Sequence, residues 1–159
     1  MNREEILNNI KDRFKDCIKN FVDKSPKRIY IDIEPKCLRD VVCYVFKDLQ
    51  ARFNTASGIH TRVGFEILYH FSFDNLGLII SLRVKLETDK ARIDSITPII
   101  KGAEWIEREM HELLGIDFVG HPNLKRLLLA EDWPEGVYPL RADYKEWDKN
   151  SIRDRGVKE

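Results

Sequence analysis

The sequence predicts an α+β fold, in which helices pack on one face of a mixed or antiparallel sheet of about four strands and an extended C-terminal tail follows. Three observations support this prediction. Two alternating apolar segments are joined by a short turn, helical apolar spacing flanks them, and both periods disappear near the C-terminus. With 159 residues, the chain is long enough for one domain that buries roughly two thirds of its unfolded surface.

The first third of the chain predicts a helix, a strand and a second helix. Apolar residues recur every three or four positions from Ile6 to Phe21, which is the stripe of an amphipathic helix, and Ser25-Pro26 ends it. Residues 28–33 are short and β-branched, as in a strand. Apolar residues between positions 37 and 53 return to helical spacing.

The middle of the chain predicts a hairpin. Residues 65–73 and 78–86 have the composition and alternation of strands, and the Asp-Asn-Leu-Gly segment at 74–77 suits a turn between them. Alternation along 78–86 places one side of each strand in the core. A further short strand is expected over 92–97, before Pro98.

A charged helix is expected over residues 103–114, with Ile106, Met110 and Leu113 on one face and Trp105 and Leu114 widening the apolar stripe. Gly115 suits the left-handed conformation that ends many helices.

The charges of this helix allow two interpretations of nearly equal weight. Glu104 and Glu112 each lie four residues from Arg108, so both carboxylates can reach its guanidinium. Each such surface pair contributes only about 0.3 to 0.5 kcal/mol. The cluster is therefore either an ordinary solvated face or a contact with a partner chain, where Arg–carboxylate pairs provide register and specificity.

A third interpretation is a stand-alone enzyme that uses Glu107, His111 and His121 around a metal or as an acid/base pair. These residues lack a third metal ligand at a familiar spacing. The nearby Arg108 would also lower carboxyl pKa values and weaken a general acid.

Composition and targeting signals exclude several classes of protein. Lys plus Arg and Asp plus Glu both number 27, so no net charge attracts nucleic acid. No segment has the roughly 20 apolar residues that cross a bilayer, and the N-terminus lacks an apolar signal segment, so a cytoplasmic location is expected. The odd set Cys17, Cys37 and Cys43 predicts small buried side chains rather than disulfides or cluster ligands.

The chain is predicted to divide into an α+β core domain, 1–130, and an extended partner-binding ribbon, 131–159. The ribbon contains Pro134, Gly136 and Pro139 and no helical or strand period. Its aromatic side chains alternate with charges, as in an interface with a polar rim.

Two motifs resemble one known family. The first is Glu-Arg-Glu at 107–109, Glu112, Leu113-Leu114, His121, Lys125 and Leu127-Leu128. The second is Pro-Leu-Arg-Ala-Asp-Tyr at 139–144. They resemble the 30 kDa subunit family, also called the C-type subunit family, of proton-translocating NADH:quinone oxidoreductases (complex I) and membrane-bound energy-converting [NiFe] hydrogenases. The family's second motif has Lys and Phe where this chain has Ala142 and Tyr144. The segment around Trp133 looks more like the hydrogenase and formate hydrogenlyase branch.

The resemblance implies a cofactor-free accessory subunit of an electron-transport complex, with no catalytic residue of its own. Its expected partners are the large hydrogenase-like (49 kDa-type) subunit and small iron–sulfur subunits. Iron–sulfur clusters, and in hydrogenases a Ni–Fe centre, would belong to those partners. The location implied is the cytoplasmic side of the cell membrane, reached only through partner subunits. The expected interface residues are Glu107, Arg108, Glu109, Glu112, His121, Arg126, Asp132, Trp133, Tyr138, Arg141, Asp143 and Tyr144.

Overall fold

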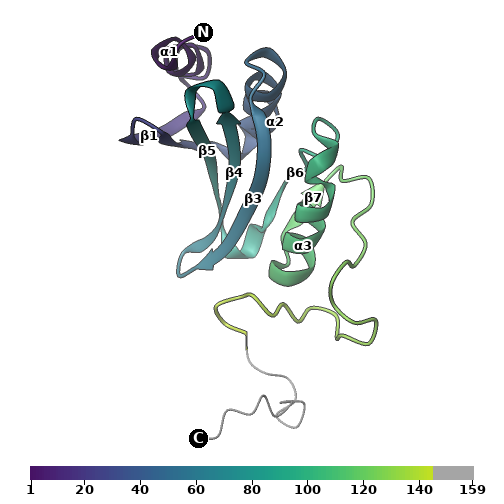
Figure 1. Ribbon diagram of the computed structural model, residues 1–159. Coiled ribbons are helices and arrows are strands. Elements are labelled where there is room, and N and C mark those ends of the chain that lie inside the picture. The colour runs from purple at the N-terminus through teal and green to yellow at the C-terminus, as the bar shows by residue number, and fades with distance from the viewer. Residues whose placement is uncertain (145–159) are drawn as a thin grey trace, which may run out of the picture.

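The computed structural model describes residues 1–144 and contains a five-stranded sheet with helices on one face (Figure 1). A smaller sheet and a third helix lie beside its β3 edge. The main sheet has the order β1-β2-β5-β4-β3. Its strands are β1 (Ile18–Ser25), β2 (Arg28–Ile33), β3 (Arg52–Thr61), β4 (Gly64–Phe73) and β5 (Leu78–Leu86). The other elements are α1 (Arg3–Arg13), α2 (Leu38–Cys43), β6 (Arg92–Asp94), α3 (Glu104–Leu114) and β7 (Asp117–Val119).

The sheet is mixed, because β2 and β5 run parallel while its other neighbouring strands are antiparallel. Leu82 on β5 lies opposite Ile31 on β2 and Tyr69 on β4, and all three side chains are fully buried. Alternate residues of these strands therefore form one apolar layer beneath the helices. The smaller sheet pairs β6 with β7 in parallel, and α3 lies between these two strands in the sequence, preceded by a turn over residues 95–103.

The predicted α+β class is confirmed, and so are the strand at 28–33 and the hairpin of β4 and β5. The predicted first helix was too long: α1 ends at Arg13, and Ile18 begins β1. Pairing with β2 decides this segment, and a register shift between Ile18 and Asn20 lets Ile18 and Phe21, three positions apart, both pack against the core.

The second predicted helix is also shorter than expected. α2 ends at Cys43 and continues as a π-helical turn over Tyr44–Asp48. The chain then enters β3, which the sequence did not predict and which contains His60. The last predicted strand is limited to β6, and β7 was not predicted.

The prediction of three unpaired cysteines was wrong, because Cys17 and Cys37 form a disulfide and Cys43 remains a free thiol. The two half-cystines are 20 positions apart in sequence. Pairing of β1 with β2 brings them together, as the hydrogen bond from Glu34 N–H to the Cys17 carbonyl indicates. Strand register, rather than a spacing motif, creates this disulfide.

After β7 the chain follows α3 without forming a helix or strand as far as residue 144 (Figure 1). We call residues 124–144 the strap. The remainder of the predicted ribbon, residues 145–159, lies outside the described residues. Within residues 1–144 no helix has the length and apolarity needed to span a membrane.

Candidate interaction site on the signature helix

Glu107 is a buried acceptor at the centre of the motif. Its side chain has 0% exposure, and its carboxylate accepts hydrogen bonds from the Ser95 hydroxyl, the Ile96 N–H and the Thr97 hydroxyl at 2.5 to 2.8 Å. These donors belong to the turn that follows β6. Glu107 therefore joins this turn to α3, and any influence on a partner must act through the residues that it positions.

His121 is buried beside this carboxylate. Its Nδ1 accepts the N–H of Asn123 at 3.0 Å, so the hydrogen-bond pattern places the ring proton on Nε2, which donates to the Glu104 carbonyl at 3.0 Å. The same Nε2 lies 3.9 Å from Glu107. Nε2 thus connects the loop after β7 to the first turn of α3, while Nδ1 holds a turn within that loop.

A third buried polar group, the Tyr69 hydroxyl, lies near this pair and has no hydrogen-bond partner within residues 1–144. Burial, together with the nearby negative charge of Glu107, raises the pKa of Tyr69 well above its ordinary value. The hydroxyl therefore remains protonated over the physiological range.

The expected ion pairs of Arg108 with Glu104 and Glu112 do not form within the described residues. Arg108 donates instead to the carbonyls of Lys125 and Arg126, at 2.8 and 2.7 Å. The Glu112 carboxylate accepts the backbone N–H groups of the next three strap residues, Leu127, Leu128 and Leu129, at 2.8, 2.5 and 3.4 Å. Arg108 and Glu112, one turn apart on α3, thus bind the carbonyl groups and the N–H groups of one irregular segment.

Arg126 organises the next part of the strap. Its guanidinium donates to the carbonyls of Ala130, Glu131 and Trp133 at 2.5 to 3.0 Å. The Trp133 indole N–H in turn donates to the Val137 carbonyl at 2.8 Å. Because the planar guanidinium serves several acceptors at once, one side chain fixes the strap's turn.

The end of the strap is attached to the C-terminus of α3. Arg141 donates to the Leu114 carbonyl at 2.7 Å, and its guanidinium lies 4.3 Å from the ring centroid of Tyr138. A cation is favourable where a helix leaves its last carbonyls unpaired. Gly115, with φ of +76°, permits this contact, because a Cβ there would lie 2.5 Å from the Arg141 guanidinium and 2.6 Å from the Tyr138 ring.

His60 on β3 forms a second attachment for the strap end. Its ring stacks on Phe65 at 4.5 Å, and Nδ1 accepts the Ala142 N–H at 3.1 Å. The Asp143 carboxylate lies 3.6 Å from the same nitrogen, and Tyr144 N–H closes a turn onto the Arg141 carbonyl. Sequence analysis missed His60, because the packing of β3 against α3 that brings it beside the motif joins segments far apart in sequence.

The predicted interface residues thus fall into two groups. Most of the motif charges bind backbone of the same chain, whereas Glu109 is half-buried and Asp132 and Asp143 are exposed. Exposed apolar side chains not predicted as interface residues accompany them: Trp105 is 68% exposed, Leu128 61% and Leu140 58%. Met110 and Leu114 of the predicted apolar stripe are buried, but the prediction that Trp105 widens the stripe was wrong, since this side chain faces away from the core.

Two of the three residues of the alternative enzyme site, Glu107 and His121, lie 3.9 Å apart. His111 uses Nδ1 to bind the Ile116 carbonyl at 2.8 Å, while Glu107 and His121 have the backbone and hydroxyl partners given above. Among residues 1–144 no group of three or more His, Cys, Asp or Glu side chains is arranged to hold a metal ion.

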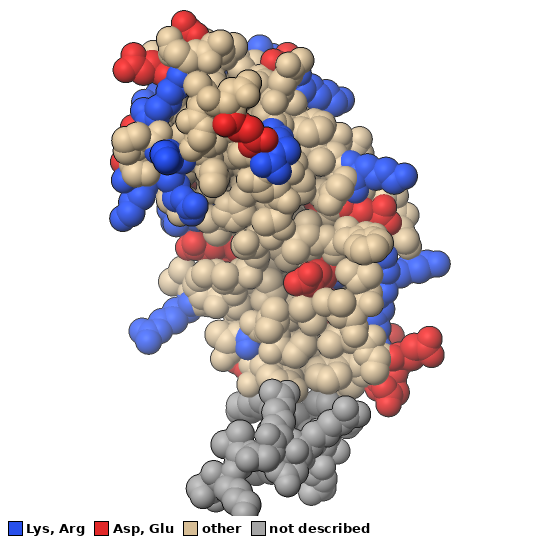
Figure 2. Space-filling view, in the orientation of Figure 1, with Lys and Arg blue, Asp and Glu red and all other residues tan. Residues whose placement is uncertain are grey.

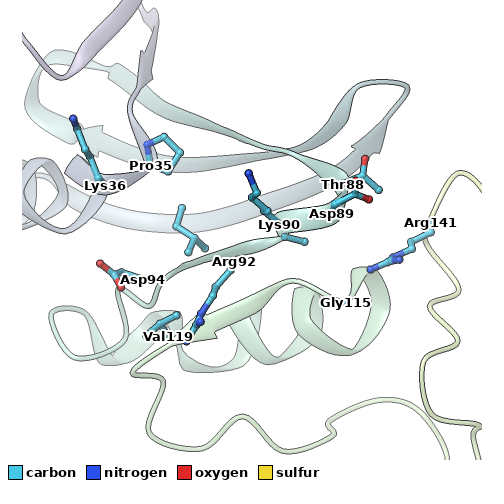
Figure 3. A pocket seen from close by; sticks show the side chains of 12 residues that line it. Pro35, Lys36, Thr88, Asp89, Lys90, Arg92, Asp94, Gly115, Val119 and Arg141 are labelled. Carbon is cyan, nitrogen blue, oxygen red and sulfur yellow. The ribbon is translucent and has the colours of Figure 1, made fainter.

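A hollow of about 890 Å³ lies elsewhere, between β6 and Pro35 (Figure 3). Its basic side chains are dispersed: Lys36 and Lys90 lie on one side, and Arg141 stands at the far end. Lys90 is paired with Glu87, and Arg92 is paired with Asp117. These charges do not converge on one ligand position.

Comparison with known proteins gives a consistent set of relatives. Residues 31–150 match the family described as the 30 Kd subunit of respiratory-chain NADH dehydrogenase. The chain is 30% identical over 156 residues to the C-type subunit of F(420)H(2) dehydrogenase from Methanosarcina mazei, an alignment that covers 96% of this chain and 98% of that protein.

Two further matches concern a longer relative and the fold. The chain is 36% identical over 104 residues to the C/D-type subunit of NADH-quinone oxidoreductase from Erwinia tasmaniensis, covering 65% of this chain but only 17% of that protein. A chain in the structure of the membrane-bound sulfane sulfur reductase, an archaeal respiratory membrane complex, superposes with a TM-score of 0.82 at 22% identity, covering 98% of this chain and 95% of that one. This likeness shows a shared fold.

Proposed function

Because the chain belongs to the family of the 30 kDa subunit of respiratory-chain NADH dehydrogenase, we propose that it docks onto the large, 49 kDa-type subunit of a complex I-like oxidoreductase. It acts there as an accessory subunit on the cytoplasmic side of the membrane and contributes neither a cofactor nor a catalytic residue. Iron–sulfur clusters, and a Ni–Fe centre if the complex is a hydrogenase, belong to the large and small partner subunits.

The observation that carries this proposal is the attachment of an irregular strap to α3. Arg108 and Glu112 bind the strap's first residues, and Arg141 binds its end to the last carbonyl of the helix. Backbone that lacks strand or helix pairing gains a defined shape from these contacts. The result is a preformed surface, which lowers the entropic cost of binding a partner.

The exposed composition of this surface supports the same proposal. Leu128 and Leu140 project from the strap with more than half of their area exposed, and Asp132 and Asp143 lie nearby in sequence. Apolar side chains with charges around them are typical of an interface core and its rim. The C/D-type relative, in which the matched region is a small part of a longer chain, supports association of this fold with a larger D-type protein.

Binding of the full-length chain to the large subunit encoded in the same genome tests the proposal. Leu128→Asp places a charge on the strap surface and should weaken the complex at least 10-fold, since a buried unpaired carboxylate opposes association. Leu76→Asp is the matched control, because Leu76 is 39% exposed in the turn between β4 and β5. Its affinity should equal that of the wild type.

Arg108→Ala tests whether binding of the large subunit depends on the shape that Arg108 gives to the strap. Loss of its two carbonyl contacts should leave α1, α2 and the main sheet folded but weaken binding of the large subunit, because the strap's first residues lose their shape. Circular dichroism and the measured dissociation constant check both parts. If the wild-type chain does not bind the large subunit, or if Leu128→Asp and Leu76→Asp behave alike, the docking proposal is wrong.

A further inference from the structure

A groove runs between α3 and β3, and the end of the strap borders it. The two elements touch at Gly58, where a Cβ would lie 2.8 Å from Leu114 and 2.9 Å from Met110. Above this contact the groove has a volume of about 220 Å³, and Leu140 of the strap lies at its wall. Helix, strand and strap therefore shape one concave surface.

The side chains along the groove form an unusual helix surface. Glu109 and Leu113 line the groove, and Trp105, four residues before Glu109, extends the same row on α3 beyond the lining residues. Trp105 is 68% exposed and Leu140 is 58% exposed. A helix face that remains in water normally carries mixed charges, whereas this row carries large apolar groups on both sides of one carboxylate.

Figure 2 shows few charged side chains over the middle of the molecule, where β3 and α3 lie side by side, while basic and acidic groups crowd its edges. Glu109 is the charged residue among those that line the groove. Within residues 1–144 its carboxylate forms no hydrogen bond or ion pair, in contrast to Glu107 and Glu112 on the same helix. The groove thus presents an uncompensated negative charge beside apolar side chains.

This isolated charge defines the chemistry of an occupant. Covering the groove with a purely apolar segment would bury an unpaired carboxylate, which costs more than the apolar contacts return. A segment that brings a cation to Glu109 avoids this cost and forms a charge-assisted hydrogen bond. A cation among apolar side chains therefore matches both properties of the groove.

We propose that the groove between α3 and β3 receives a segment of the large subunit that places a Lys or Arg against Glu109 and apolar side chains against Trp105, Leu113 and Leu140. The inference rests on the proposed docking function and names the chemistry of the contact. It assigns Glu109 a direct role in recognition, in contrast to the buried Glu107, two positions away.

The test measures the dissociation constant between the full-length chain and the large subunit. Glu109→Gln retains the shape of the side chain and removes its charge, and affinity should fall about 10-fold to 100-fold, as expected for loss of a charge-assisted contact. Asp12→Asn on α1 removes the same charge from an exposed position distant from the groove, and it should leave affinity unchanged. The difference between wild type and Glu109→Gln should shrink as salt is raised.

Charge reversal identifies the partner residue. Glu109→Lys should abolish binding, and changing basic residues of the large subunit to Glu, one at a time, should restore it in one case. Binding by the wild type with no loss in Glu109→Gln overturns the groove assignment and leaves the docking function intact, whereas failure of the wild type to bind contradicts both. A change in the oligomeric state of the isolated chain upon Glu109→Lys would show a second copy as the occupant and also overturn the proposal.

Discussion

Replacing Glu107 by Leu tests whether the motif's most buried charge is structural. The substitution keeps a side chain of similar size but removes the acceptor for three donors: the Ser95 and Thr97 hydroxyls and the Ile96 N–H. Ser95 remains an acceptor for Thr97 N–H at 3.1 Å, so the turn keeps one of its own hydrogen bonds. The loss is therefore confined to the link between this turn and α3.

The expected cost follows from counting these donors. A buried donor without an acceptor costs about 1 to 3 kcal/mol, and hydroxyls lie at the low end because they can rotate. Ile96 N–H cannot rotate away, so the three groups together amount to about 3 to 5 kcal/mol. Folded domains are typically stable by only about 5 to 15 kcal/mol. For a chain of this length, the change corresponds to a melting temperature lower by about 10 °C.

Glu107→Gln is the matched variant, since its amide oxygen can accept Ile96 N–H while its NH₂ group donates to hydroxyl oxygens. Its cost should stay below about 1.5 kcal/mol. Urea unfolding of the wild type and both variants, followed by circular dichroism, measures the two differences. If Glu107→Leu were within about 1 kcal/mol of the wild type, the buried carboxylate would not be holding the turn, and the structural role inferred for the motif would be refuted.

Three further perturbations test other parts of the structure. Gly115→Ala should release the end of the strap, because a Cβ there clashes with Arg141 and the residue would retain a φ of +76°. Limited proteolysis should then cleave faster near residue 141 while α3 stays folded, and an unchanged cleavage rate would contradict this prediction. Removing the Cys17–Cys37 disulfide with a double Ser substitution should lower unfolding free energy by about 3 kcal/mol, the loop-closure value for 20 residues, while a reducing agent should affect only the wild type. Burial, and then the charge of Arg28, lower the pKa of His70 below its ordinary 6.5. The unfolded state therefore binds the proton more readily, so the stability contributed by this residue is present above about pH 6.5 and is lost as the pH falls through the folded-state pKa; His70→Gln should flatten the stability profile in this window, and an identical profile would exclude the effect.

Local sequence was sufficient to predict an element where its own residues carry a clear apolar period or a turn motif. The hairpin of β4 and β5 combines alternation with a turn whose Gly77 adopts φ of +57°, and both strands appear at the expected positions within a residue. Strand β2 and helix α3 were equally clear. By contrast, β1 and β3 are the two edge strands of the sheet and bury few side chains. They therefore lack a clear apolar alternation, and their spacing patterns suited a helix or a loop as well.

The motif shows the same division at the level of single residues. The sequence by itself determined that a charged helix ending at Gly115 precedes an aromatic, irregular segment, and the two residue motifs that these segments carry identified the family. Only the tertiary structure decided which charge has which task. Glu107 and Glu109 differ by two positions, which turns their side chains about 200° apart around a helix. One meets the donors of the turn after β6, and the other faces an open groove. Those donors come from a different part of the chain, so no pattern within the helix could distinguish the two carboxylates.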